Sequence, residues 1–73
     1  MKIALFMILC SGVAGNCLEP IKINDNYDTF YDCMVSGYEE SITKMQEVGP
    51  ISINEHKMFI KFYCTPEKNK IST

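Results

Sequence analysis

The chain has 73 residues, of which 47% are hydrophobic and 22% are charged, and its formal net charge at pH 7 is −2. All seven basic residues are lysines. Binding to nucleic acid is therefore excluded as the main function, because that binding needs a dense basic face and commonly uses arginine to read bases. A chain of this length forms one small domain with a limited apolar core.

The N-terminal segment has the pattern of a secretory signal. Lys2 precedes an apolar run over 3–13, and a run of about 11 residues suits a signal peptide but not a transmembrane helix, which needs about 20. Small residues end at Gly15, where a signal peptidase can cut. The sequence predicts a signal peptide over 1–15 and one mature domain over 16–73, secreted and with no stable membrane insertion after cleavage.

Three cysteines follow the predicted cut, namely Cys17, Cys33 and Cys64. Small secreted domains usually depend on disulfides, so we interpret these cysteines as scaffold. No CxxC pair occurs, which argues against thioredoxin-like chemistry and against a zinc knuckle. Three is an odd number, and one thiol is left over after a single internal bridge.

Residues 25–48 have helical periodicity. Asp25 can cap the start, and Gly49-Pro50 ends the pattern. Gly37 inside it costs about 1 kcal/mol relative to alanine, so a bend or break is expected there. The apolar positions that recur at helical steps are Tyr27, Phe30, Tyr31, Met34, Val35, Tyr38, Ile42 and Met45.

These apolar side chains fall on a stripe about 140° wide, and Cys33 projects about 60° beyond its edge. We predict that the stripe is the core and that Cys33 is a flanking residue suited to a bridge. The alternative is a contact surface, because tyrosine is enriched in binding hot spots. On that alternative the candidate binding residues are Tyr27, Tyr31 and Tyr38.

The third segment is ambiguous. Ser52 and Glu55 form a capping-box pattern that favours a helix over 53–64, whereas alternating apolar residues over 57–64 favour a strand. We prefer the helix, because a lone strand lacks an obvious partner. The expected fold is a small, mainly α, disulfide-stabilised secreted domain: a helical hairpin of 25–48 and 53–64 with an extended N-terminal arm. The alternative is an α+β fold with a short strand at 57–64.

In such a hairpin Cys33 and Cys64 differ in height by about 6 Å, which makes them the favoured disulfide. Cys17 on the arm is then the spare thiol and can link two chains into a homodimer. Pairing of Cys17 with either of the other two stays open. The polar residues 66–73 are expected to form a flexible tail.

No catalytic, metal or cofactor site is predicted, and the chain is not expected to be an enzyme. His56 is the only histidine, and we expect it to be an ordinary exposed residue. Asp25, Asp28 and Asp32 suggest a calcium loop, but the turn glycine and the bidentate glutamate are missing. Helix capping and the helix dipole explain them better.

These features favour a small secreted effector that binds another extracellular protein. The architecture resembles that of venom and salivary peptide precursors, although no family motif matches the cysteine spacing. A disulfide-linked structural or assembly protein is the second hypothesis. A membrane-active defence peptide is the third, and the acidic charge disfavours it.

Overall fold

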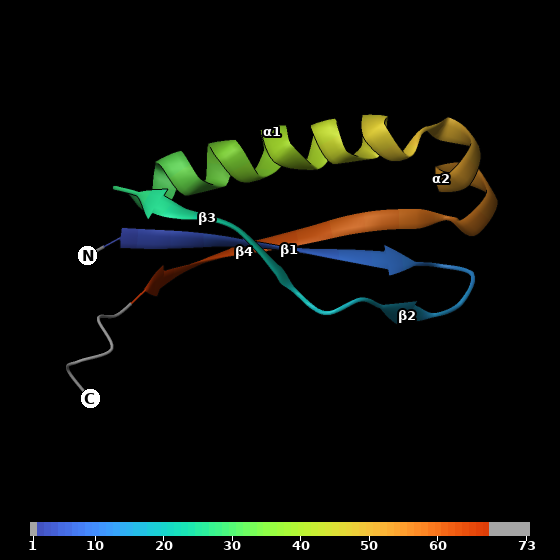
Figure 1. The fold of residues 1–73 in the computed structure, drawn as a ribbon, viewed down its shortest axis with the longest axis horizontal. Coiled ribbons are helices and arrows are strands. Elements are labelled where there is room, and N and C mark those ends of the chain that lie inside the picture. The colour runs from blue at the N-terminus through green and yellow to red at the C-terminus, as the bar shows by residue number, and fades with distance from the viewer. Residues whose placement is uncertain (1, 68–73) are drawn as a thin grey trace.

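The computed structural model describes residues 2–67, and these form a four-stranded antiparallel sheet with a long helix across one face (Figure 1). A second, short helix joins the long helix to the last strand. In chain order the elements are β1 (Lys2–Ser11), β2 (Asn16–Cys17), β3 (Ile21–Tyr27), α1 (Phe30–Val48), α2 (Pro50–His56) and β4 (Met58–Glu67).

β1 is the central strand of the sheet. It pairs with β4 along its whole length, from Lys2 opposite Glu67 to Ser11 opposite Met58. On its other edge it pairs with β3, and near its end with β2. β3 and β4 therefore run parallel to each other with β1 between them. A nearly continuous apolar run is what a central, buried strand needs.

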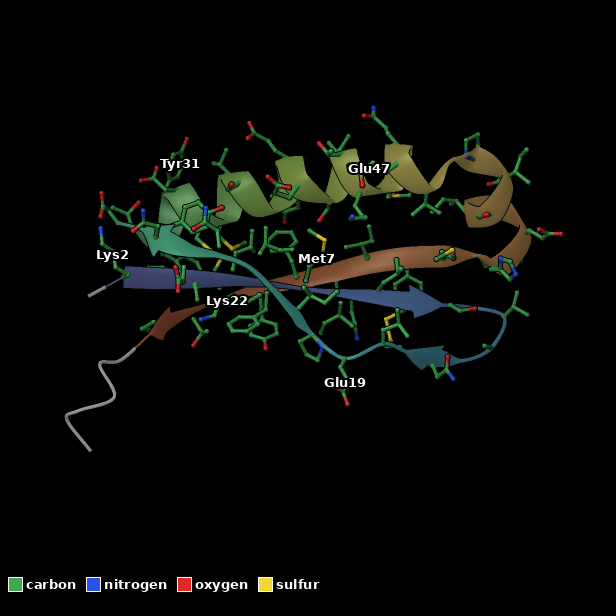
Figure 2. All side chains as sticks on the ribbon, viewed as in Figure 1. Lys2, Met7, Glu19, Lys22, Tyr31 and Glu47 are labelled. Atoms are coloured by element: carbon green, nitrogen blue, oxygen red, sulfur yellow. A yellow bond between two sulfur atoms is a disulfide. The ribbon has the colours of Figure 1, made fainter. Side chains whose placement is uncertain are left out.

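The core lies between β1, β4 and α1. Directly paired residues share one face of a sheet, so Leu5 and Met7 of β1 lie on the same side as their β4 partners Cys64 and Phe62. That side faces α1, and Figure 2 shows Met7 between the sheet and the helix. Leu5 and Cys33 are completely buried and Met7 nearly so. The other two buried apolar residues, Ala4 and Cys10, also lie on β1, but at alternate positions that face the other side of the sheet, where Cys10 is bonded to Cys17.

The expected mainly helical fold is wrong, because the protein is α+β. The first helix exists, but it begins at Phe30 rather than at residue 25. Thr29, not Asp25, is its N-cap, and its hydroxyl accepts a hydrogen bond from the backbone N–H of Asp32 at 3.1 Å. Residues 25–27 belong to β3 instead.

The second predicted helix, 53–64, is also wrong. α2 stops at His56, Lys57 adopts a left-handed backbone conformation with φ 51°, and β4 begins at Met58. The alternative prediction, a short strand at 57–64, agrees with the observed β4, which covers Met58–Glu67. The helix is the preferred prediction because a strand there lacks an obvious partner in the mature chain. The partner is β1, which lies within the predicted signal peptide.

The face of α1 that is buried against the sheet is not the predicted one. Cys33, expected as a flanking residue, is completely buried, and Gly37 is buried one turn later. The helix continues through Gly37 without a break. The small side chains of this face allow α1 to lie close to β4, whereas most of the expected core stripe is exposed.

The predicted signal peptide over 1–15 contains β1. A cut after Gly15 would remove the central strand and Cys10, so the sheet described here belongs to the uncut chain. The cut itself stays a prediction. The predicted arm is extended, as β2 and part of β3. Of the predicted tail, Pro66 and Glu67 belong to β4, and 68–73 lie outside the described residues.

Within the described part of the chain, neither helix has the length and apolar character needed to cross a bilayer.

Candidate functional site

The most prominent surface feature is a row of exposed apolar side chains along α1, which we call the α1 stripe. Its members are Tyr31, Val35, Tyr38, Ile42 and Met45, with exposed fractions of 75, 39, 61, 58 and 37%. Successive members are four and three residues apart in alternation, which places them on one face of a helix. Figure 2 shows Tyr31 on the side of α1 away from the sheet.

The rotation of α1 that exposes the stripe is held by two contacts of its other face. Cys33 forms a disulfide with Cys64 of β4, with a Cα–Cα distance of 6.2 Å. Gly37, one turn later, lies against the ring of Phe62. At 100° per residue this face points about 140° away from the centre of the stripe. The stripe therefore cannot turn inward without breaking the covalent bond or the close packing at Gly37.

The two borders of the stripe differ in charge. On one border each residue directly follows a stripe residue, and this border consists of Asp32, Glu39 and Gln46. The other border consists of Met34, Ser41 and Val48. Lys44, the lysine of α1, lies on neither border and is paired with Glu47 at 3.0 Å. The stripe is therefore an apolar seam with acidic residues along one side.

An open pocket lies at the C-terminal end of the stripe, where α1 meets α2. It has a volume of about 350 Å³ and is lined by Ile42, Met45, Gln46, Pro50, Ile53 and Asn54. The turn that forms it depends on Gly49, whose φ of 91° favours glycine, and on Pro50 at the start of α2. Ile42 and Met45 belong to both features, so the stripe and the pocket form one continuous surface.

Of the three tyrosines predicted as binding residues, the structure brings two together. Tyr31 and Tyr38 lie on the stripe. Tyr38 also makes an edge contact with Phe62, with ring centroids 4.8 Å apart. Tyr27 lies on β3, where its hydroxyl is 2.8 Å from the hydroxyl of Ser36, and it takes no part in the stripe.

Sequence reasoning missed Val35, Ile42 and Met45 as surface residues, and it missed the pocket. Their spacing predicts a core face, because a small protein usually needs such a row for its interior. The signal that could have found them is the row of small residues at Cys33, Gly37 and Ser41. Small side chains at steps of four indicate a face on which a helix packs closely.

Both disulfides tie neighbouring elements. Cys33 and Cys64, the favoured pair of the sequence analysis, are bonded to each other. Cys17, expected as a spare thiol, is bonded to Cys10, its partner in the β1–β2 pairing. Within residues 2–67 no cysteine is free, so the uncut chain offers no thiol for a link between two copies.

The other polar residues singled out in the sequence lie apart from the stripe. His56 ends α2, and its Nδ1 is 3.3 Å from the carbonyl oxygen of Ser52. Asp28 accepts a hydrogen bond from Lys2, and this bond and the lysine charge lower the pKa of its carboxyl. Asp25 pairs with Lys22 at 3.3 Å. No group of three possible metal ligands occurs in the described part of the chain.

No protein-family model, no curated protein and no solved structure matches this chain.

Proposed function

We propose that the protein is a small extracellular protein-binding module and that the α1 stripe is its contact surface. The observation that carries the proposal is the continuous exposure of the stripe, with Tyr31 75% and Tyr38 61% exposed. Single exposed apolar residues are ordinary, but a contiguous apolar patch bordered by polar residues is typical of an interaction site. Tyrosine contributes a large amphipathic contact area at a small entropy cost.

The rigidity of α1 supports this proposal. The Cys33–Cys64 disulfide and the contact between Gly37 and Phe62 hold the helix in one orientation on the sheet. A surface that is ordered before binding loses less conformational entropy when the partner arrives. A partner therefore meets a preformed apolar seam rather than a helix that must first be ordered.

The extracellular location is supported by the disulfides, because such bonds form and persist in oxidising compartments, and the Cys33–Cys64 bond lies wholly in the part of the chain after Gly15. We propose that residues 1–15 direct export and are removed after Gly15. α1, β4 and the Cys33–Cys64 bond all follow that position in the chain. The cut removes no residue of the α1 stripe, but it removes β1, with which β4 pairs along its whole length. The orientation of the stripe described here is therefore that of the uncut chain.

The other two hypotheses have less support. A membrane-active helix needs cationic residues beside its apolar face, whereas the charged border of the stripe carries Asp32 and Glu39. Assembly through Cys17 needs a free thiol; Cys17 is bonded to Cys10 in the uncut chain, so this hypothesis applies only to a chain from which the cut has removed Cys10.

Site-directed photo-crosslinking tests the proposal. A photoreactive residue is placed at Tyr31 or at Ile42 and exposed to the extracellular fluid of the producing organism. The matched control carries the same residue at Glu40, which is exposed on the opposite side of α1. We expect both stripe positions to capture the same protein, with capture reduced by excess unmodified chain. Equal capture from Glu40, or none from the stripe, would overturn the proposal.

A further inference from the structure

We propose that the partner presents an amphipathic helix with cationic residues beside its apolar face, and that one large apolar side chain of this helix occupies the pocket between α1 and α2. This inference rests on the proposed function, and it adds the chemical class of the partner. Three features of the surface support it: the spacing of the stripe, the charge of its border, and the pocket at its end.

The spacing matches a helix better than an extended peptide. The alternation of four and three residues from Tyr31 to Met45 is the a/d spacing of helices that pack side by side. The stripe is about 21 Å long at 1.5 Å per residue, which corresponds to about four turns. An extended peptide usually gains affinity by pairing with a strand edge, and a helical face offers no such edge.

The charged border selects a cationic partner. Asp32 and Glu39 are seven residues apart and hold the same position relative to the stripe, where neighbouring helices exchange ion pairs. Both residues are exposed, and no ion pair within residues 2–67 involves either one. Lysine or arginine opposite them would steer the encounter and set the register of the two helices.

A second copy of this chain does not supply that chemistry. A parallel copy would place Met34, Ser41 or Val48 opposite the acidic border, and an antiparallel copy would place Asp32 and Glu39 there again. Neither arrangement offers a cation.

The pocket provides the anchor for the end of the partner helix. Its apolar lining comes from Ile42, Met45, Pro50 and Ile53, whereas the amides of Gln46 and Asn54 can bind water or polar groups. A recess continuous with an apolar seam is the usual place for a hot-spot side chain, because water is excluded from it on binding.

Two synthetic helical peptides of 21 residues test the inference. Both carry leucine at the a and d positions; one carries lysine and the other glutamate at the e and g positions. Their affinities for the oxidised 73-residue chain are measured by fluorescence anisotropy at low and high salt. We expect the lysine peptide to bind at least about tenfold more tightly at low salt, and the difference to shrink as salt is added.

Variants of the chain assign the effect to the stripe. Reversal of the border charges, D32K with E39K, is expected to abolish or invert the preference for the lysine peptide. The matched control, E40K with E55K, makes the same change in net charge away from the stripe and should keep the preference. Ile42→Ser and Ile53→Ala are expected to weaken binding of the lysine peptide by about tenfold or more, with the helix content by circular dichroism unchanged.

Several results would overturn the inference: equal binding of the two peptides, no binding of either, or a preference that the control reversal removes as effectively as the border reversal. Self-association of the chain that buries the stripe, seen by sedimentation, would also overturn it. If crosslinking at Tyr31 and Ile42 captures a protein while the peptides fail, the proposed function stands and only the partner class is wrong.

Discussion

Gly37 of α1 lies over the ring of Phe62 of β4, so closely that a Cβ atom added to Gly37 would be 2.3 Å from Cε1 of that ring. The same ring makes an edge contact with Tyr38, the next residue along the helix. This relationship sets both the distance between α1 and the sheet and the direction in which the stripe faces.

Gly37→Ala is expected to destabilise the protein even though alanine is the better helix former. The gain in helix propensity is about 1 kcal/mol. Forcing a methyl group into a packed ring typically costs about 1–3 kcal/mol, and here three ring atoms lie within 3 Å of the new atom. Urea unfolding followed by circular dichroism measures the balance. A more stable Gly37→Ala variant would show that α1 does not pack on Phe62.

The two disulfides are expected to contribute unequally to stability. Cys33 and Cys64 are 31 residues apart, whereas Cys10 and Cys17 are 7 apart. In the chain-entropy model the longer loop gives about 4 kcal/mol and the shorter one about 2 kcal/mol. Replacing each pair by alanine and comparing the unfolding free energies tests this order. A larger loss of unfolding free energy in the Cys10/Cys17 variant than in the Cys33/Cys64 variant would contradict the predicted order and the role given to the bond between α1 and β4.

The ion pair between Lys2 and Asp28 predicts a pH effect in the acid range. The lysine lowers the pKa of Asp28 below its ordinary value of 3.8. The contribution of this pair to stability is therefore present above pH 3.8 and is lost as the pH falls through the lowered pKa. A carboxyl titration of Asp28 by NMR should show the depressed pKa, and Lys2→Gln should restore the ordinary value. Identical titrations of the two proteins would show that β1 does not place Lys2 beside Asp28.

Export is expected to yield a chain that begins at Asn16. Such a chain lacks β1, and Cys17 is left without Cys10. Intact mass analysis of material from the medium reports the first residue, and alkylation without reduction reports whether Cys17 is free or capped. A secreted product that keeps Met1 and the Cys10–Cys17 bond would refute the cut and would show that the four-stranded sheet is the extracellular form.

Part of this fold could be read from the sequence. The long helix over most of 25–48 and its end at Gly49-Pro50 follow from local periodicity and from residues that stop a helix. The strand after Lys57 could not be decided locally, because its main-chain partner is β1, which lies far away in the sequence and pairs with it over ten residues. That partner lies within residues 1–15, which the sequence predicts to be a signal peptide.

The sequence identifies some residues of the candidate site but not that they are exposed. Spacing alone shows that Tyr31, Tyr38 and Ile42 share a face, but not whether that face points inward. Cys33 and Gly37 determine the orientation of the helix. Cys33 is bonded to Cys64 of β4, and Gly37, which has no side chain, lets the helix approach Phe62 of β4 closely. Cysteine and glycine have little or no side chain to bury compared with tyrosine and isoleucine, so the sequence pattern favours the larger row as the core.

Carbene footprinting of the oxidised 73-residue chain, resolved to single residues by mass spectrometry, tests most directly whether the α1 stripe is surface. We predict strong labelling at Tyr31, Tyr38 and Ile42 and protection at Leu5 and Met7. Protection of the stripe to the level of Leu5, with labelling at the Gly37 face of α1, would contradict the orientation of the helix and the binding function proposed for it.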